Sequence, residues 1–255
     1  MPVDPAPSEP TRNCEPPQGR PAGCWGALAA ATVAEHALTL TLATLRRLSR
    51  WTRTLQVERG WRGPEIYGGI SLFGRRVGIH GFGCVARQLV KLLEPFGCDI
   101  AAYSHGVPHQ LMAEFGVEAC DSLEALFERS EVLVEAEALT AVSCRSVTAD
   151  VLSRLPDGAA FINVGRGGVV DQEALVEAIR SGRLHAGLDV YELEPLPADS
   201  PLRSLQNVTL TPHVGGPTID HRRRCGQRAI DSLKQYAAGE VPQGIITPEI
   251  YDRST

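Results

Sequence analysis

From Arg75 onward the sequence alternates between short β-type runs and helical segments, and this alternation constrains the fold more than any other feature. The runs typical of strands cover residues 76–80, 99–103, 131–135, 159–164, 184–190 and 208–210. Helical segments are expected between them at 84–94, 108–115, 123–129, 149–154 and 172–181, with a long helix over about 219–238. Strands that alternate with helices build βαβ units, so the sequence predicts a doubly wound parallel α/β sheet.

The first expected strand runs into a glycine-rich turn, Gly81-Phe82-Gly83-Cys84-Val85-Ala86. In a G-x-G-x-x-A turn the first glycine permits the tight bend, the second lets the backbone approach a pyrophosphate, and the small third residue lets helix and strand pack closely. The N-terminus of the following helix supplies amide donors for phosphates. An ordinary glycine-rich turn is the alternative, but the strand–turn–helix context favours a dinucleotide site in a Rossmann-type domain.

The end of the second expected strand is where an acidic residue would bind the adenosine ribose of NAD. The chain has Ser104 and His105 there, and Asp99 lies at the wrong end of the strand. Without a carboxylate, NAD loses a hydrogen-bond acceptor and NADP loses a repelling charge. The sequence therefore leaves the choice between NAD and NADP open and predicts a weak preference.

Three further clusters follow later strands: residues 163–171 around Arg166, residues 187–195 with Asp189 and Glu194, and Thr211-Pro212-His213. Each residue alone has a structural explanation, as a turn arginine, a solvated acid or a histidine at a strand end. All of them, however, share the carboxyl edge of the sheet with the glycine-rich turn, where open α/β sheets bind ligands. An arginine, a carboxylate and a histidine beside a nicotinamide indicate hydride transfer coupled to proton transfer.

At residues 33–36, 81–86, 163–171, 188–202 and 211–216 the chain resembles the D-isomer-specific 2-hydroxyacid dehydrogenases. The resemblance implies NAD(P)-dependent oxidation of the CH–OH group of a small 2-hydroxy acid, or reduction of a 2-keto acid in reverse. It implies that Arg166 binds the substrate carboxylate, that His213 is the acid–base and Glu194 its partner, and that Asp189 lies near the nicotinamide. The cofactor contacts that it implies are Gly81, Gly83, Cys84, Val85, Ser104, His105, Thr140, Val164, Gly165, Asp189, His213 and Gly215, with no metal.

The chain departs from the family pattern beyond Ser104. Ala136 and Ala138 stand where the family commonly has a histidine and a proline. The family also builds its substrate domain mainly from N-terminal residues, most of which are expected to be missing here.

The sequence suggests three regions of different character. Residues 1–23 contain seven of the 18 prolines and are expected to form a disordered tail. Residues 27–216 are expected to form the dinucleotide-binding domain, beginning with a helix over 27–50 and an extended arm over 51–75. Residues 217–255 would form a C-terminal helix and tail, the remnant of the substrate domain.

The helix and arm embrace a second subunit in the family, which predicts a homodimer. Apolar side chains on the arm, including Leu72, would cover the partner. A net charge of −5 argues against binding to nucleic acid, and no segment is apolar enough to suggest a membrane span. Seven cysteines without a C-x-x-C pair suggest reduced thiols in the cytoplasm.

Two alternatives remain at this stage. The chain could be a cofactor-sensing regulator, as in the corepressor branch that resembles these dehydrogenases, or a catalytically incompetent fragment. The presence of Arg166, Glu194 and His213 together argues against a pure sensor, which does not need a proton-transfer pair.

Overall fold

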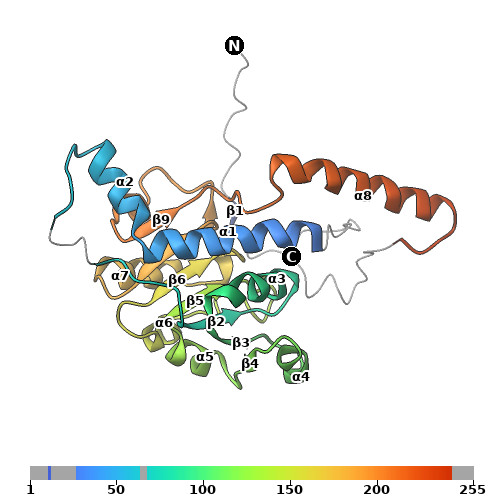
Figure 1. The fold of residues 1–255 in the computed structure, drawn as a ribbon, viewed down its shortest axis with the longest axis horizontal. Helices are drawn as coiled ribbons and strands as arrows, with labels where there is room; N and C mark the ends of the chain where they lie inside the picture. The colour runs from blue at the N-terminus through green and yellow to red at the C-terminus, as the bar shows by residue number, and fades with distance from the viewer. Residues whose placement is uncertain (1–10, 13–26, 64–67, 243–255) are drawn as a thin grey trace, which may run out of the picture.

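A seven-stranded parallel sheet forms the centre of the molecule in the computed structural model, which describes residues 11–12, 27–63 and 68–242 (Figure 1). In spatial order its strands are β4 (Glu118–Ala119), β3 (Asp99–Tyr103), β2 (Arg76–His80), β5 (Val132–Glu135), β6 (Ala160–Asn163), β7 (His185–Leu188) and β9 (Val208–Leu210). The predicted doubly wound α/β fold is confirmed. From β2 the chain adds β3 and β4 on one side of the sheet and then β5, β6, β7 and β9 on the other side. Folds of this class bind ligands at the point where the direction of strand addition changes.

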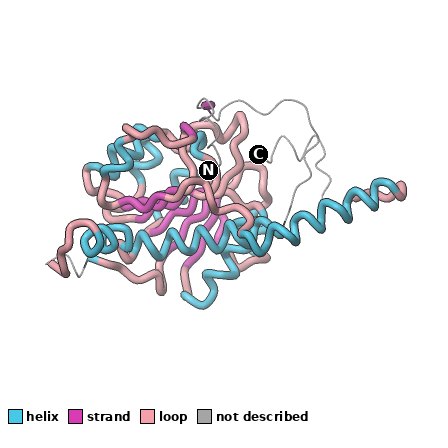
Figure 2. The backbone as a smooth tube through the Cα atoms, turned by 90° about the horizontal axis from the view of Figure 1, so that it is seen from above, coloured by secondary structure: helices cyan, strands magenta, loops and turns pink. Residues whose placement is uncertain are grey.

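Helices cover both faces of the sheet, and Figure 2 shows the strands lying between them. On one face, α1 (Ala27–Leu45) and α3 (Cys84–Leu93) share a core with the sheet. On the other face lie α5 (Leu123–Arg129), α6 (Ala149–Arg154) and α7 (Gln172–Arg180). Burial on both faces explains why central strands such as β5 are almost continuously apolar. The remaining short elements of this domain are η2 (Glu94–Phe96), α4 (His109–Ala113), η3 (Gly167–Val169) and η4 (Pro201–Ser204).

The prediction of a single helix over residues 27–50 is wrong. Helix α1 ends at Leu45, and α2 (Leu48–Gln56) starts after Arg47, whose φ of 53° is left-handed. The break lets the carbonyl of Leu45 accept a hydrogen bond from the amide of Ile70, where the chain returns. Helix α2 then packs beside the edge strand β9. Ser49 on α2 donates a hydrogen bond to the hydroxyl of Thr209 on β9.

The segment after α2 is also less extended than expected, since α2 itself occupies residues 51–56. Leu72, expected to cover a partner, is only 2% exposed and packs in the core of its own domain. The amide of Gly74 donates to the carbonyl of Phe96, which fixes the segment beside η2. Two other apolar residues of the arm, Ile66 and Tyr67, lie outside the described residues.

Of the Pro-rich segment 1–23, the structure describes residues 11 and 12. They form β1 (Thr11–Arg12), which pairs antiparallel with β8 (Leu193–Glu194). At these two residues the structure differs from the expected disorder, and the others lie outside the described residues.

Helix α8 (Ile219–Ala237) follows the sheet and extends away from the domain (Figure 1). Cys225 is its one buried residue in the described structure. Neither α8 nor any other helix in the described ranges has the length and apolar character needed to cross a membrane.

Candidate functional site

The glycine-rich turn joins β2 to α3 at the switch point of the sheet. Gly81 has a φ of +92°, and a Cβ there would lie 2.6 Å from the amide nitrogen of Glu137. Both the left-handed backbone and the close approach therefore require glycine. Gly83 and Cys84 are exposed, whereas Val85 is half-buried and Ala86 is buried.

The N-terminus of α3 has features that suit a phosphate group. Ser122, Thr148 and Asp171 cap α5, α6 and α7 with side-chain hydrogen bonds. Helix α3 instead begins after Gly83 without a side-chain cap, and a Cβ at Gly83 would meet no atom within 4 Å. Uncapped amides beside open space fit the pyrophosphate of a dinucleotide.

The end of β3 differs from the sequence expectation. Ser104 and His105 lie there, but a carboxylate is present as well, because Ser104 Oγ donates a 2.8 Å hydrogen bond to Oε2 of Glu137. Glu137 was not predicted as a site residue, because the acid of such a site is expected on β3 itself. Its position two residues after β5, at the same edge of the sheet, was the available signal.

A buried ion pair lies beneath the turn. Nδ1 of His80, the last residue of β2, is 2.6 Å from Oε2 of Glu135 on β5, and both side chains are almost fully buried. Burial alone would lower the pKa of His80, but the charge and hydrogen bond of Glu135, helped by Glu137, outweigh it and raise the pKa above its ordinary value.

Arg166 is held in a loop at the end of β6. The side chain of Asn163 bonds both to the amide of Gly165 at 3.0 Å and to the carbonyl of Arg166 at 3.3 Å. A Cβ on Gly167 would overlap the backbone carbonyl of Tyr191, so glycine lets this loop pack against the loop that carries Glu194. Burial lowers the pKa of the Arg166 guanidinium, which the charge of Glu194 partly offsets.

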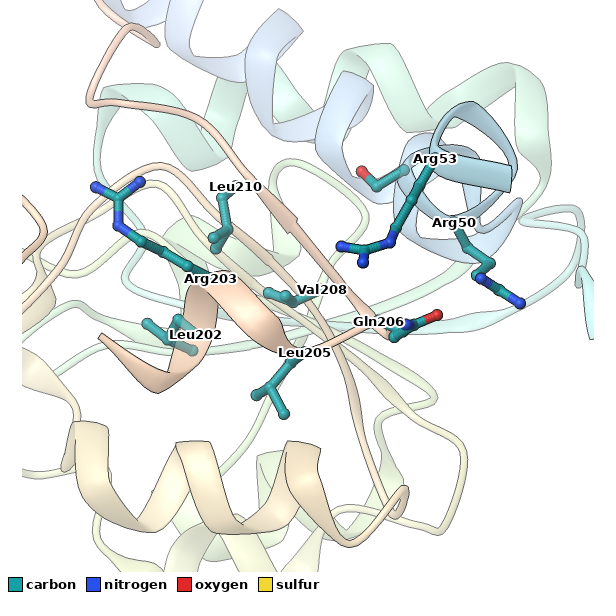
Figure 3. Close-up of a pocket in the computed structure, with 9 residues that line it drawn as sticks. Arg50, Arg53, Leu202, Arg203, Leu205, Gln206, Val208 and Leu210 are labelled. Atoms are coloured by element: carbon teal, nitrogen blue, oxygen red, sulfur yellow. The ribbon is translucent and has the colours of Figure 1, made fainter. Parts of the chain in front are cut away.

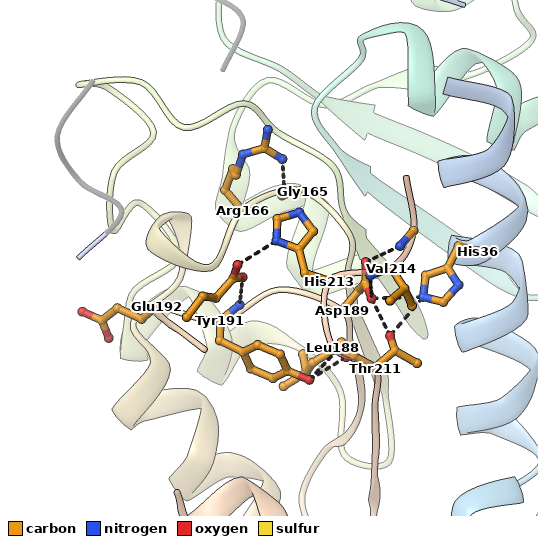
Figure 4. A network of polar contacts seen from close by, with 12 residues as sticks. His36, Gly165, Arg166, Leu188, Asp189, Tyr191, Glu192, Thr211, His213 and Val214 are labelled. Carbon is orange, nitrogen blue, oxygen red and sulfur yellow. Dashed lines mark hydrogen bonds and ion pairs between the residues drawn. The ribbon is translucent and has the colours of Figure 1, made fainter. Parts of the chain in front are cut away.

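His213 and Glu194 form the centre of the site (Figure 4). Nδ1 of His213 lies 2.7 Å from Oε2 of Glu194, while Oε1 of Glu194 accepts a hydrogen bond from the amide of Tyr191. The imidazole is about half exposed, and Figure 4 shows it beside Arg166. His213 has a left-handed φ of 54°, and its amide donates to the carbonyl of Asp189.

The carboxylate of Asp189 is a buried hydrogen-bond centre that holds the His213 loop. It accepts hydrogen bonds from the hydroxyl of Thr211 and from the amides of Val214 and Gly215. Nε2 of His36 on α1 lies 3.3 Å from Oδ1. Burial would raise the pKa of Asp189, but these hydrogen bonds outweigh it and hold the pKa well below its usual range.

The remaining predicted cofactor contacts also lie at this edge. The amides of Val164 and Gly165 donate to the carbonyl of Glu135. Thr140 bonds to Ser143 through both its amide and its hydroxyl. Thus the carboxyl ends of β2, β3, β5, β6, β7 and β9 bring the predicted residues together along one edge, although their contacts with a ligand remain a prediction.

One cavity lies at this edge, and a second lies beside the edge strand β9. The larger, of about 580 Å³, is lined by Tyr191, Glu194, Leu210 and His213 among others. The smaller, of about 200 Å³, lies between α2 and β9, and Figure 3 shows Arg50, Arg53 and Arg203 around it. Glu58 pairs with both Arg50 and Arg53, so one of these three positive charges is offset within the chain. Within the described ranges, no group of three or more His, Cys, Asp or Glu side chains is arranged to hold a metal ion.

Comparison with known proteins gives the family. The profile of the D-isomer specific 2-hydroxyacid dehydrogenase NAD binding domain matches residues 38–215. D-3-phosphoglycerate dehydrogenase of Methanocaldococcus jannaschii is 32% identical over 84% of this chain, and glyoxylate reductase of Korarchaeum cryptofilum is 32% identical over 86%. The chain spans only 41% of the former protein and 67% of the latter.

Solved structures agree with this relationship. A D-isomer specific 2-hydroxyacid dehydrogenase from Xanthobacter autotrophicus, solved in complex with NADPH and MES, is 30% identical with a TM-score of 0.76. The match covers 92% of this chain and 95% of that one. A phosphoglycerate oxidoreductase from Rhizobium etli is also 30% identical with a TM-score of 0.76, over 86% of this chain and 67% of that one. The chain therefore belongs to the D-isomer specific 2-hydroxyacid dehydrogenase family and carries its NAD-binding domain.

Proposed function

We propose that this chain is the cofactor-binding part of an NAD(P)-dependent oxidoreductase that interconverts a small 2-hydroxy acid and its 2-keto acid. The observation that carries the proposal is the 2.7 Å contact between His213 Nδ1 and Glu194 Oε2 at the edge that also bears Arg166. Relatives named as a glyoxylate reductase and a phosphoglycerate dehydrogenase support this substrate class.

In the proposed mechanism a bound nicotinamide supplies or accepts the hydride, and the chain manages the proton. Glu194 keeps the proton of His213 on Nδ1, which leaves Nε2 directed to the substrate. Nε2 donates its proton to the keto oxygen during reduction and removes the hydroxyl proton during oxidation. The planar guanidinium of Arg166 binds the substrate carboxylate.

The test combines binding and turnover. Titration with NADH and NADPH, followed by fluorescence, measures cofactor binding, and loss of absorbance at 340 nm measures reduction of glyoxylate and hydroxypyruvate. In a catalytically competent form, His213→Ala should lower turnover by roughly a hundredfold or more, because acid–base catalysis is lost. Cofactor affinity should stay close to that of the unmodified chain, and unchanged turnover would refute the assignment.

We further propose that the chain alone binds a dinucleotide but turns over 2-keto acids poorly. Hydride transfer needs the substrate held against the nicotinamide in a closed cleft, and such positioning supplies on the order of 7–11 kcal/mol. The two enzymes of Methanocaldococcus jannaschii and Korarchaeum cryptofilum are longer, and a chimera with the N-terminal half of a related dehydrogenase tests whether that part closes the cleft. Turnover by the short chain on the order of 10 per second would overturn this proposal.

We also propose that the chain forms a homodimer, with α2 and the residues that follow it at the interface. Leu48, Leu55, Val57 and Trp61 are between 49% and 74% exposed. Apolar side chains gathered on α2 and the residues that follow it need a covering surface, and a second copy supplies it. Sedimentation at micromolar concentration should report a dimer, and Trp61→Glu with Val57→Glu should give a monomer.

A cytoplasmic location belongs to the same proposal. In the described part of the chain the cysteines at positions 84, 98, 120 and 225 are free thiols, which suits a reducing compartment. Cell fractionation tests this location directly.

A further inference from the structure

The end of β3 carries a negative charge that the sequence of β3 does not supply. The carboxylate of Glu137 reaches it from the segment after β5 and accepts the 2.8 Å hydrogen bond from Ser104 Oγ. Strand β2 lies between β3 and β5, so the side chain of Glu137 crosses the width of one strand.

The crossing depends on the glycine-rich turn. A Cβ on Gly81 would lie 2.6 Å from the amide nitrogen of Glu137, so the absence of a side chain lets the segment after β5 lie directly on the turn after β2. From there the Glu137 side chain extends to Ser104. The carboxylate thus lies beside the turn expected to receive the pyrophosphate, at the strand end expected to receive the ribose.

Two hydrogen bonds fix this carboxylate, and a third fixes the backbone of Glu137. Its Oε2 accepts from Ser104 and its Oε1 from the amide of Ala138 at 3.0 Å. The amide of Glu137 itself donates to Oε1 of Glu135 at 2.8 Å. The side chain is therefore held in place before any ligand arrives.

The charge on Glu137 is also less compensated than that of its neighbour. Glu135 is buried and bonded to the imidazole of His80, which is the positive partner in this cluster. The two donors to the Glu137 carboxylate, a hydroxyl and an amide, are neutral, and the side chain is partly exposed. A ligand at the end of β3 therefore meets an anion.

We propose that Glu137 is the residue that selects NAD over NADP. This inference rests on the proposed function, since it requires a dinucleotide on the turn at Gly81. The carboxylate accepts hydrogen bonds from the ribose hydroxyls of NAD, as an acid at the end of the second strand does in other dinucleotide sites. The same charge repels the 2′-phosphate of NADP, which carries nearly two negative charges at neutral pH. With Glu137 at this position we expect a preference for NAD, where Ser104 alone predicts a weak one.

The experiment measures dissociation constants of NADH and NADPH for the full chain and its variants. The unmodified chain should bind NADH at least about tenfold more tightly than NADPH, because like charges oppose the latter. Glu137→Gln keeps the shape of the side chain but removes its charge. It should lower the ratio of the NADPH to the NADH dissociation constant by about tenfold, mainly through tighter binding of NADPH. Glu137→Asp keeps the charge and should retain the preference.

Two controls isolate the position of the charge. Glu94→Gln removes the same charge from the opposite end of α3, where the side chain is exposed, and should leave the ratio unchanged. Ser104→Ala removes the hydroxyl but not the carboxylate, so the preference for NADH should persist. Competition by 5′-AMP and by adenosine 2′,5′-bisphosphate should reproduce the same order, because the two fragments differ only in the 2′-phosphate.

The opposing outcomes are distinct. An unchanged ratio in Glu137→Gln would overturn the inference while leaving dinucleotide binding intact. Tighter binding of NADPH than NADH, lost in His105→Ala, would show that the exposed imidazole at the same strand end determines selectivity. Failure of both dinucleotides to bind any variant would overturn the proposed function and this inference with it.

Discussion

Nε2 of His36 and Oδ1 of Asp189 lie 3.3 Å apart, and both side chains bond to the hydroxyl of Thr211. Helix α1, the end of β7 and the end of β9 are thereby joined through one buried carboxylate. The same carboxylate accepts hydrogen bonds from the amides of Val214 and Gly215, so this contact also fixes the loop that carries His213.

Asp189→Asn should destabilise the domain by about 2 kcal/mol or more, because an amide nitrogen replaces one buried acceptor and leaves amide donors unsatisfied. Urea denaturation at pH 7 measures the loss. Asp199→Asn, on an exposed position of a nearby loop, is the matched control and should leave the free energy of unfolding nearly unchanged.

The effect of Asp189 should also depend on pH. Its pKa is depressed in the folded state, so its stabilisation is complete above the unfolded value of 3.8 and is lost as the pH falls through the folded value. The difference in unfolding free energy between the unmodified chain and Asp189→Asn should therefore shrink on acidification below about pH 4. A difference that stays constant in acid would contradict the assignment of the charge to Asp189.

The His80–Glu135 pair should give the opposite dependence. The pKa of His80 is raised in the folded state, so its stabilisation is complete below the unfolded value of 6.5 and is lost as the pH rises through the folded value. The free energy of unfolding should fall as the pH rises above the unfolded value of 6.5 and through the folded value. His80→Leu combined with Glu135→Leu should remove this slope. An apolar pair can replace a buried ion pair, so the main loss of stability should come from the amide of Glu137, which loses Oε1 of Glu135 as its acceptor. An equal pH dependence of the unfolding free energy in the unmodified chain and the double variant would show that other groups cause it.

Gly167→Ala should lower stability by about 1–3 kcal/mol, because the new Cβ would overlap the backbone of Tyr191 and force two packed loops apart. The displaced loop carries Arg166, so the KM for a 2-keto acid should rise in a competent form. Gly226→Ala is the control: no atom lies within 4 Å of that position on α8, and the change should stabilise the helix by up to about 1 kcal/mol.

Glu194→Gln should reduce turnover by about tenfold to a hundredfold in a competent form, because the imidazolium of His213 loses its anionic partner. The amide oxygen still accepts a hydrogen bond, so Glu194→Ala should cost more. Glu192→Gln tests whether the effect is local: this neighbouring acid pairs with Arg145 at 3.0 Å and points away from His213 in Figure 4. Equal losses in the variants of Glu192 and Glu194 would refute the role of Glu194.

Much of the fold could be predicted because its signals are local. The bounds of β2, β3 and β9 agree with the sequence prediction at both ends, since buried parallel strands are apolar runs bounded by turn residues. The glycines at 81 and 167 likewise predict where the backbone must bend or approach closely. The edge of the sheet that carries the site follows from the order of strands and helices alone.

The remainder depends on contacts between distant segments. Nothing near Arg47 in the sequence ends a helix, and the break is explained only by the returning chain, which bonds to Leu45 through Ile70. Glu137 is separated from Ser104 by 33 residues and by an intervening strand. Its role could not be predicted by aligning β3 with a family pattern, because the side chain belongs to another strand.

The docking of α1 also determines when the domain can become complete during synthesis. This helix packs against β6, β7 and β9, and His36 meets Thr211 across 175 residues of sequence. Helix α1 is synthesised before all strands of the seven-stranded sheet, so its contact with β9 can form only after the last of these strands has been made. Because non-local contacts form late and leave apolar surface exposed meanwhile, the part of α1 that packs on β7 and β9 stays uncovered until almost the whole sheet has been made.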